Sequence, residues 1–349
     1  MSGGRSWPGV LSSLLDGEHL DAADTRWVMD RVMAGAATPA QLAGFAVALR
    51  AKGETATEVA GLVDSMLSHA IRVDVPGRAV DIVGTGGDRA NTVNISTMAA
   101  VVMAGAGATV VKHGNRAASS KCGAADLLEG LGVAISMPAA AVAHTVREVG
   151  IGFCFAPVYH PSFRHAGGPR RELGIPTVFN FLGPLTNPAQ PVAAAIGCGN
   201  ARMAPVMAQV LAGRAADVLL FRGDDGLDEL TTTTTSTVWQ VAGGAVRQLT
   251  LDPLDVGIPR SEPADLRGGE VAENVAVARA LLGGKRGPVR DAVVLNAAAG
   301  LAAHAGFTGD LLADLRSGIQ RAGAALDNGA AADVLTRWVS LGRKLSTEG

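Results

Sequence analysis

Glycine, charged and hydroxyl residues gather in two short stretches that each follow an apolar run, and both stretches suit the binding of an anion. The first, residues 84–88, reads GTGGD and follows the apolar residues 79–83. Its glycines allow consecutive backbone N–H groups to turn inward, which builds a nest for phosphate oxygens. Residues 94–97 then open a predicted helix, so that free N–H groups and the positive end of the helix dipole lie beside this nest.

The second stretch, residues 112–116, reads KHGNR and follows another predicted strand. Lys112 and Arg116 supply fixed positive charge, and Ser119 and Ser120 supply hydroxyl donors suited to phosphate oxygens. Either stretch by itself is compatible with an ordinary turn. Because successive parallel strands place their carboxyl ends at one edge of a sheet, the two stretches together predict a polyphosphate site.

Two adjacent carboxylates, Asp228 and Glu229, follow the predicted strand at residues 218–221. An acidic pair on a loop is usually solvated charge. Beside a polyphosphate, however, hard oxygen ligands are what Mg²⁺ takes from a protein, with phosphates and water completing its shell. The pair is therefore a candidate metal site.

Residues 159–187 are rich in Pro, Gly and Arg, and they contain Arg164, Arg170 and Arg171. A guanidinium group offers a two-pronged, charge-assisted contact to a carboxylate. The segment is either a long connection or, as its basic cluster favours, a crossing over the mouth of an active site.

The elements that must position these residues alternate between strands and helices from residue 79 onward. This rhythm predicts a mainly parallel sheet with helices on both faces, and a hairpin follows it. The predicted strands are residues 79–83, 109–111, 152–156, 192–197 and 218–221, then the hairpin at 237–241 and 246–251. The predicted helices are residues 125–131, 139–149, 273–282, 292–303, 311–325 and 331–341.

Residues 1–72 are predicted to form a small helical domain, joined by part of residues 159–187, and residues 73–349 to form the larger catalytic domain. Thr38 and Thr55 each begin a capping box that precedes an apolar helix. A helical unit this small leaves apolar faces uncovered, so we expect the chain to form a homodimer through it.

The composition excludes several classes of function. Of the 349 residues, 48% are hydrophobic and 18% are charged, which is typical of a globular protein. A net charge of −2 gives no general attraction to nucleic acid or to an anionic membrane. The strongly apolar residues 98–111 are too few to span a bilayer. Three cysteines far apart in sequence, and an N-terminus without a signal-peptide pattern, favour a cytoplasmic protein with reduced thiols.

The motifs GTGGD, NxST, KHGNR and SSxxGxAD, in that order, resemble those of the anthranilate phosphoribosyltransferase family. The resemblance continues through RRELGIPTVFNFLGPLTN at residues 170–187 and GLDE at residues 226–229, and it covers nearly the whole chain. It implies a nucleoside phosphorylase-like fold, in which a small helical N-terminal domain joins a larger α/β domain with a mainly parallel sheet. It also implies the second step from chorismate in tryptophan biosynthesis. In that step phosphoribosyl pyrophosphate (PRPP) donates its 5-phosphoribosyl group to the amino group of anthranilate, and N-(5-phosphoribosyl)anthranilate and pyrophosphate are the products.

The resemblance further implies which residues form the site. Two Mg²⁺ ions would accompany the donor, with Ser96, Asp228 and Glu229 as metal-binding residues and both carboxylates acting in catalysis. The positions implied for binding the donor are Gly84, Gly87, Asp88, Thr92, Asn94, Ile95, Ser96, Thr97, Lys112, Asn115, Arg116, Ala117, Ala118, Ser119, Ser120 and Ala124.

For the acceptor, the resemblance implies contacts from Gly84, Asn115 and Arg170. His113 would either orient a substrate or accept the amine proton, since a neutral imidazole accepts a proton at cellular pH. A histidine simply packed beside a strand end is an equally good interpretation. Ala124 and Arg222 depart from the pattern common in the family.

Two other functions compete with this interpretation. A pyrimidine nucleoside phosphorylase shares the architecture and a KHG phosphate loop, but it needs no paired magnesium carboxylates. A non-catalytic relative that binds nucleic acid would show a basic face and would have lost the metal ligands. The chain has 30 Lys and Arg against 32 Asp and Glu and keeps both carboxylates, so the enzyme is favoured.

Overall fold

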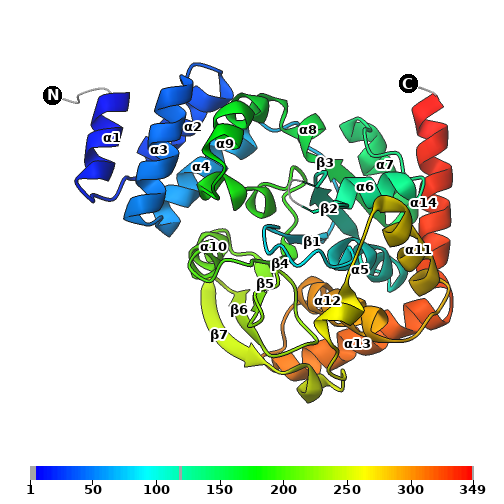
Figure 1. Cartoon of the computed structure of the whole chain (residues 1–349). Coiled ribbons are helices and arrows are strands. Elements are labelled where there is room, and N and C mark those ends of the chain that lie inside the picture. The colour runs from blue at the N-terminus through cyan, green and yellow to red at the C-terminus, as the bar shows by residue number, and fades with distance from the viewer. Residues whose placement is uncertain (1–4, 118–119, 348–349) are drawn as a thin grey trace.

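A seven-stranded sheet in the order β3-β2-β1-β4-β5-β6-β7 forms the centre of the molecule (Figure 1). The computed structural model describes residues 5–117 and 120–347, so the predicted donor-binding residues Ala118 and Ser119 lie outside the described residues. The strands are β1 (Val80–Gly84), β2 (Val110–Gly114), β3 (Ile151–Phe155), β4 (Ala193–Gly197), β5 (Asp217–Gly223), β6 (Ser236–Ala242) and β7 (Ala245–Leu251).

Strands β1 to β5 are parallel, and β6 and β7 add an antiparallel hairpin at one edge. The predictions of a mainly parallel sheet and of a terminal hairpin are therefore confirmed. From β1 the chain builds β2 and β3 on one side, and it then returns to place β4 on the other side of β1. In open sheets of this kind, ligands bind outside the carboxyl ends of the strands where the order reverses. Here that point lies at the ends of β1 and β4.

Strand β2 is longer than the sequence predicted. Lys112 and His113 were expected in a loop, but they belong to the strand and pair in register with Phe153 and Cys154 of β3. Backbone pairing with the parallel strand β3 extends β2 through these two polar residues, although their own strand propensity does not predict it. As a result both side chains have fixed directions.

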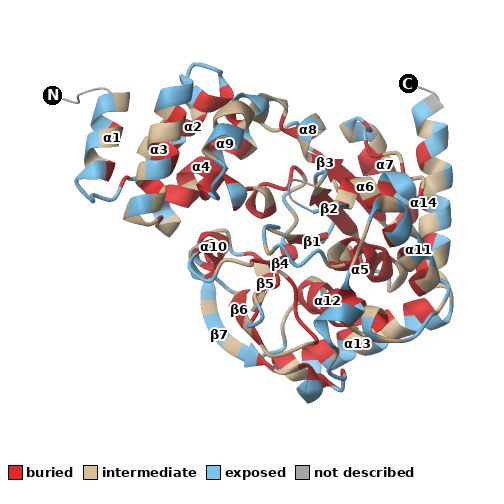
Figure 2. Ribbon diagram, viewed as in Figure 1, coloured by how far each residue is buried: buried red, intermediate tan, exposed pale blue. Residues whose placement is uncertain are grey.

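Helices cover both faces of the sheet. Helices α5 (Ile95–Gly105) and α12 (Pro288–Ala305) lie against one face, and most of their residues are buried (Figure 2). Helix α10 (Met203–Ala212) covers β5 and β6 on the other face. The remaining helices of this part are α6 (Ala124–Gly130), α7 (Ala139–Val149), α11 (Val271–Leu282), α13 (Leu311–Asp327) and α14 (Ala330–Thr347). None of the helices among the described residues is both long and apolar enough to cross a bilayer.

The N-terminal helices are α1 (Trp7–Leu15), α2 (Ala22–Met33), α3 (Pro39–Lys52) and α4 (Ala56–Ser68). The predicted capping boxes are present: the hydroxyls of Thr38 and Thr55 accept from backbone N–H groups three residues later, and the Gln41 and Glu58 side chains accept from the N-cap N–H groups. The bundle and the α10 face of the sheet share one hydrophobic cluster, so the helices are not a separate body.

Residues 156–187 leave the sheet and return to these helices as a run of short elements. They are α8 (Ala156–Tyr159), η1 (Pro161–Ala166), α9 (Gly167–Leu173), η2 (Val178–Asn180) and η3 (Gly183–Leu185). In Figure 1, α9 lies beside α3. Short 3-10 elements η4 (Pro253–Val256) and η5 (Pro263–Leu266) follow the hairpin.

Candidate functional site

The loop that follows β5 crosses the carboxyl ends of β1 and β4, and two glycines make this crossing possible. A Cβ on Gly84 would lie 2.1 Å from the Asp228 carboxylate, and a Cβ on Gly197 would lie 1.6 Å from the Asp228 carbonyl oxygen. A side chain on Gly197 would collide with the loop backbone, whereas a side chain on Gly84 would displace the Asp228 carboxylate. The backbone N–H of Gly86 donates to the Asp228 carboxylate at 2.7 Å, which ties the GTGGD loop to the acidic pair.

The acidic loop is held from behind by α12. The backbone N–H of Leu230 donates to the side-chain oxygen of Asn296, and the Asn296 amide donates back to the Leu230 carbonyl, both at 2.9 Å. Asn296 is buried. This two-way clamp fixes Glu229 next to the sheet instead of leaving it in solvent.

The two carboxylates carry strongly raised pKa values. Withdrawal from water, and then the charge of Asp88, raises the pKa of Asp228 to about 7. Burial and the neighbouring Asp228 raise the pKa of Glu229 well above its usual range. Buried carboxyl groups that raise one another's pKa have too little positive charge around them, so a cation that binds beside them is stabilised.

Lys112 is the nearest cation, and it is buried. Its ammonium group donates to the Ile82 carbonyl and lies 3.5 Å from the Ser96 hydroxyl. Burial lowers the pKa of Lys112, whereas the carboxylates of Asp81, Glu229 and Asp228 oppose this shift. One ammonium group therefore faces three carboxylates, and the net charge of these four side chains favours a further cation.

The predicted metal-binding residues meet at this point. The backbone N–H of Ser96 faces the Glu229 carboxylate, and its hydroxyl is directed to Lys112. Asn94 is the N-cap of α5, and Ser96 lies within the first turn of that helix. The described residues contain no cluster of three His, Cys, Asp or Glu side chains that would hold a metal alone. This donor set fits Mg²⁺, which binds through one or two carboxylates and completes its shell with substrate phosphates and water.

The second predicted loop is organised by Asp126. Its carboxylate accepts from the backbone N–H groups of Ala117 and Gly123 at 3.0 and 2.9 Å. Arg116 also binds Asp126, and it reaches Glu129. The Arg116 guanidinium thus already has two acidic partners, and it is exposed rather than turned into the loop.

Asn94 connects the two loops. Its amide donates to the Cys122 carbonyl at 2.9 Å, and its side-chain oxygen accepts from Asn274 of α11 at 3.0 Å. A cap residue that makes these bonds fixes the start of α5 relative to the second loop. Of the other predicted donor positions, Ile95 and Thr97 are buried, and Thr92, paired with Arg267, lies beside Ser120.

His113 is buried against a second histidine, His160, with ring centroids 5.3 Å apart. Nδ1 of His113 lies 3.0 Å from the Gly183 carbonyl, and Nε2 of His160 lies 2.9 Å from the Thr186 carbonyl. Because carbonyls only accept, each of these nitrogens carries the proton. Nε2 of His113 and Nδ1 of His160 remain buried without a partner among the described residues. The pair therefore presents two free acceptor nitrogens.

Burial, and then the proximity of His160, lowers the pKa of His113 to about 3. His113 is thus neutral at cellular pH. Its Nε2 is an acceptor without a partner among the described residues, and it is buried from solvent.

A buried network that the sequence did not reveal lies behind these residues. Asp81 accepts from the His113 backbone N–H at 3.2 Å and from the Asn187 amide at 2.8 Å. Asn187 also donates to the Val111 carbonyl. Burial raises the pKa of Asp81 to about 6, although Lys112 opposes the shift. A charged residue within an apolar strand was the available signal for Asp81, whereas His160 and Asn187 had none, because their roles depend on tertiary contacts.

Among the three candidate arginines, Arg170 has a distinct environment. Its guanidinium lies over the ring of Phe163, 5.3 Å from the centroid, and burial lowers its pKa. Arg164 and Arg171 are exposed. No acidic side chain among the described residues pairs with Arg170, so its charge is free to meet an anion.

The comparisons with known proteins agree with this geometry. The model of the glycosyl transferase family, α/β domain, matches residues 76–332, and the model of that family's helical bundle domain matches residues 8–70. The anthranilate phosphoribosyltransferase of Saccharopolyspora erythraea is 60% identical over 98% of this chain and 97% of its own. That of Thermobifida fusca is also 60% identical, over 96% of each chain.

Solved structures give the same result. The crystal structure of anthranilate phosphoribosyltransferase from Thermus thermophilus superposes with a TM-score of 0.89 at 40% identity and covers 96% of this chain and 99% of its own. The Saccharomyces cerevisiae enzyme in complex with PRPP and Mg has a TM-score of 0.87 at 27% identity, covering 97% and 98% of the two chains. The same yeast enzyme with 4-fluoroanthranilate has a TM-score of 0.85 at 26% identity, covering 97% and 99%.

Proposed function

This chain belongs to the anthranilate phosphoribosyltransferase family, and from that premise we propose how its residues carry the reaction. The protein is a glycosyltransferase of tryptophan biosynthesis. It transfers the 5-phosphoribosyl group from PRPP to the amino group of anthranilate and releases pyrophosphate. Two competing interpretations, a nucleoside phosphorylase and a nucleic-acid-binding relative, are not favoured, because the chain's relatives are transferases.

The donor binds across the ends of β1 and β2. We assign its pyrophosphate to the GTGGD loop, where Gly87 has a φ of +85° that suits an inward-facing N–H group. The N-terminus of α5 supplies further N–H groups and the positive end of a dipole. Residues 115–120 of the second loop bind the remaining phosphate. For Arg116 to bind the donor, its side chain must break its ion pairs with Asp126 and Glu129 and contact the phosphate in their place.

Mg²⁺ binds with the donor, as two ions held by Ser96, Asp228, Glu229 and the pyrophosphate oxygens. The raised pKa values of Asp228 and Glu229 support this assignment, because such carboxylates gain most from a cation. When bound, the metal neutralises charge on the leaving pyrophosphate.

The acceptor lies between the second loop and α9. We propose that Arg170 binds the anthranilate carboxylate through two of its guanidinium N–H groups, while Gly84 and Asn115 border the amine. His113 is neutral, and its unpaired Nε2 accepts from the amine N–H once the side chains that bury this nitrogen give way to the acceptor. In this role His113 orients the amine toward the sugar.

Positioning and electrostatics account for catalysis without a covalent intermediate on the protein. Positive charge develops on the ribosyl ring as its bond to pyrophosphate breaks, by analogy with glycosyl transfer. Lys112, fixed by the Ile82 carbonyl, stabilises the departing anion. The amine then reaches the anomeric carbon from the acceptor side.

For the assembly we propose a cytoplasmic homodimer joined through the helical domain of residues 1–72, with residues 73–349 as the catalytic domain. Exposed Leu15 and Val47 on α1 and α3 support the interface. Free thiols at Cys122, Cys154 and Cys198 are typical of a reducing compartment.

The meeting of Asp228 with Gly84 and Gly86 at the sheet switch point is the observation that carries this proposal. The direct test follows the loss of anthranilate fluorescence when PRPP and Mg²⁺ are added. Glu229→Gln preserves the shape of the side chain and removes its charge, so turnover should fall strongly while the unfolding curve stays unchanged. Wild-type turnover of this variant at limiting Mg²⁺ would show that the carboxylate assignment is wrong.

A further inference from the structure

A segment that is distant in sequence, residues 266–270 just before α11, lies against residues 91–93, which connect the GTGGD loop to α5. The backbone N–H of Gly268 donates to the Asn91 carbonyl at 2.8 Å. A Cβ on Gly268 would lie 2.7 Å from the Thr92 carbonyl oxygen. A side chain at this position would therefore push the two segments apart.

The connection to α5 has an unusual backbone conformation that these contacts support. Asn91 has a φ of +52°, and Arg89 has a φ of +60°. Residues with a side chain adopt this left-handed conformation rarely, and it persists where surrounding contacts hold it. Besides the bond to Asn91, the backbone N–H of Val93 donates to the Leu266 carbonyl at 2.9 Å. The 266–270 segment thus holds this connection on both sides of residue 92.

Asn274 of α11 extends the same contact with its side chain, which is buried. Its amide donates to the side-chain oxygen of Asn94 at 3.0 Å, and its own oxygen accepts from the Gly269 N–H at 2.9 Å. The Asn94 amide in turn donates to the Cys122 carbonyl, just beyond the second loop, at 2.9 Å. Because a backbone N–H only donates and a carbonyl only accepts, these partners fix the orientation of both amides.

This bond changes what Asn94 does at the start of α5. Asn94 is the N-cap residue, but its side chain makes no capping bond. An asparagine at this position usually accepts from an N–H group of the first turn and thereby occupies it. Here the oxygen accepts from Asn274 instead, so the cap residue leaves the N–H groups of the first turn unoccupied by its own side chain. Such N–H groups at the start of a helix bind phosphate.

Asn274 is too enclosed to contact the donor directly. The gap between Asn274, the 266–270 segment and the end of the second loop has a volume of about 10 Å³. Pockets that bind small organic molecules have volumes of about 300–1,000 Å³. Any effect of Asn274 on the donor must therefore pass through Asn94.

We propose that Asn274 is a positioning residue for donor binding, which holds the Asn94 side chain away from the first turn of α5 and fixes this turn relative to the second loop. The proposal rests on the assignment of the donor to these two loops. Without the Asn274 amide, the Asn94 oxygen caps α5 and competes with the donor phosphate for the same N–H groups. Arg170 and His113, on the acceptor side, take no part in these bonds.

Steady-state kinetics of Asn274→Ala, with each substrate varied in turn, tests this role. The KM for PRPP should rise about three- to tenfold, as expected for the loss of one hydrogen bond. The KM for anthranilate, and kcat at saturating PRPP, should stay close to the wild-type values. In a double-mutant cycle, Asn274→Ala should have no further effect on the KM for PRPP in the Asn94→Ala background, because its effect passes through Asn94.

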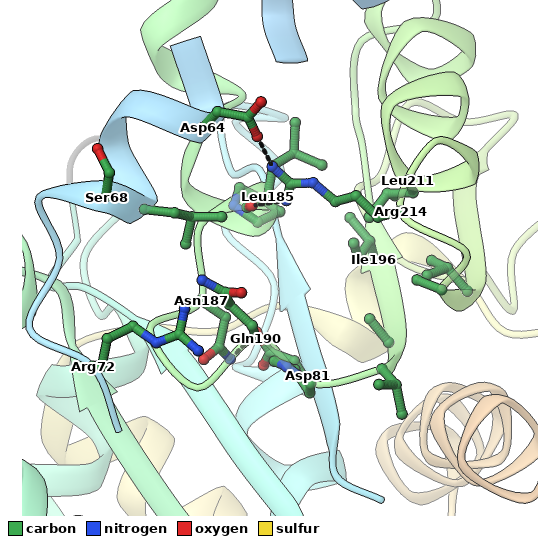
Figure 3. A pocket seen from close by; sticks show the side chains of 17 residues that line it. Asp64, Ser68, Arg72, Asp81, Leu185, Asn187, Gln190, Ile196, Leu211 and Arg214 are labelled. Atoms are coloured by element: carbon green, nitrogen blue, oxygen red, sulfur yellow. Dashed lines mark hydrogen bonds and ion pairs between the residues drawn. The ribbon is translucent and has the colours of Figure 1, made fainter. Parts of the chain in front are cut away.

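Gly268→Ala tests the same contact from the backbone and keeps the Asn274 side chain. Its Cβ should displace the 266–270 segment from Thr92 and likewise raise the KM for PRPP. Asp64→Ala is the matched control, since Asp64 of α4 also binds a side chain far away in sequence, that of Arg214 at 3.3 Å. This pair lies at a cavity between α4 and the sheet, and no residue of either donor loop lines that cavity (Figure 3). The control should leave the KM for PRPP unchanged.

Three results would overturn the proposal: an unchanged KM for PRPP in Asn274→Ala, an equal rise in both KM values, or additive effects in the cycle with Asn94. An unchanged KM for PRPP in Gly268→Ala would contradict it independently of how Asn274→Ala folds. If Asn94→Ala itself leaves the KM for PRPP unchanged, the donor assignment fails together with the proposal. If Asn94→Ala raises this KM and Asn274→Ala does not, only the role of Asn274 is overturned.

Discussion

Arg170 differs from its neighbours in what surrounds its guanidinium group. It is half-buried over Phe163, whereas Arg164 and Arg171 extend into solvent. A charge that burial has partly stripped of water interacts more strongly with an incoming carboxylate than an exposed one does. Donor binding, in contrast, is spread over two loops, and no distant arginine should dominate it.

Arg170→Ala should therefore raise the KM for anthranilate far more than the KM for PRPP. Loss of a charge-assisted contact costs roughly 1.5–3 kcal/mol, or about ten- to more than a hundredfold in acceptor affinity. Arg170→Lys should restore only part of this affinity, because an ammonium cannot make a two-pronged contact. Steady-state kinetics with each substrate varied in turn measures both effects. Arg171→Ala is the control, and equal effects on both substrates, or a larger effect in that control, would assign the acceptor to another residue.

His113 gives a prediction about acid stability. Burial depresses its pKa from 6.5 to about 3, so the folded protein binds this proton less readily than the unfolded chain. Its contribution to stability is therefore present above pH 6.5 and is lost as the pH falls toward 3. Relative to His113→Gln, which stays neutral, the wild type should lose roughly 1–3 kcal/mol of unfolding free energy between neutral pH and pH 4.

Urea unfolding of both proteins at the two pH values measures this difference. His165→Gln, at an exposed position, provides the baseline for a simple histidine replacement. If the wild type and His113→Gln lose stability in parallel as the pH falls, His113 is not the buried neutral group that the geometry indicates.

At the scale of the elements, the site depends on how closely the loop after β5 approaches β1 and β4. Gly84 and Gly197 pair across these two strands, and the backbone of Asp228 lies directly over them. The Asn296 clamp prevents the loop from moving outward. The acidic pair is thus positioned by backbone contacts, which side-chain motion cannot relieve.

Gly197→Ala should therefore displace the loop, because its Cβ would lie 1.6 Å from the Asp228 carbonyl oxygen. We expect activity to be lost and the unfolding free energy to fall by roughly 1–3 kcal/mol, as in overpacked cores. Activity assays and denaturant titration measure the two effects. Gly44→Ala in α3 is the control, since its Cβ would make an ordinary contact 3.6 Å from a Leu11 methyl group. It should leave activity unchanged, and full activity in Gly197→Ala would contradict the close approach.

At the scale of the whole molecule, α10 is the element that joins the N-terminal helices to the sheet. Arg202 at its start forms an ion pair with the buried Glu54 at 2.5 Å, and Arg214 beyond its end binds Asp64 of α4. Both arginines belong to the α/β part, and both acids belong to the bundle. One side of the bundle is therefore covered within the chain, while Leu15 on α1 and Val47 on α3 stay exposed at 78% and 41%.

These exposed positions predict where a second copy binds. Sedimentation velocity of the wild type should show a dimer, and Leu15→Asp combined with Val47→Asp should shift it toward the monomer, because burying unpaired charge at an interface is unfavourable. Leu254→Asp, at another exposed leucine on η4, is the control and should leave the dimer intact. A monomeric wild type at micromolar concentration would show that the dimer prediction is wrong.

The sequence by itself determined the local features of this protein. Glycines after an apolar strand, threonine capping boxes and the strand–helix alternation depend on backbone conformation and side-chain period, which act over a few residues. The GTGGD loop, the start of α5 near residue 95 and the mainly parallel sheet were therefore predictable. The ordered motifs also indicated the family, which the comparisons show.

Only the tertiary structure decided which distant residues share the site. The ladder with β3 made Lys112 and His113 part of a strand, and burial then set the pKa of each. His160 and Asn187 act through carbonyls and carboxylates far away in the chain, so no local pattern marks them. Charge and hydrogen bonding depend on distance in space, and the sheet order, in which β4 returns beside β1, sets those distances.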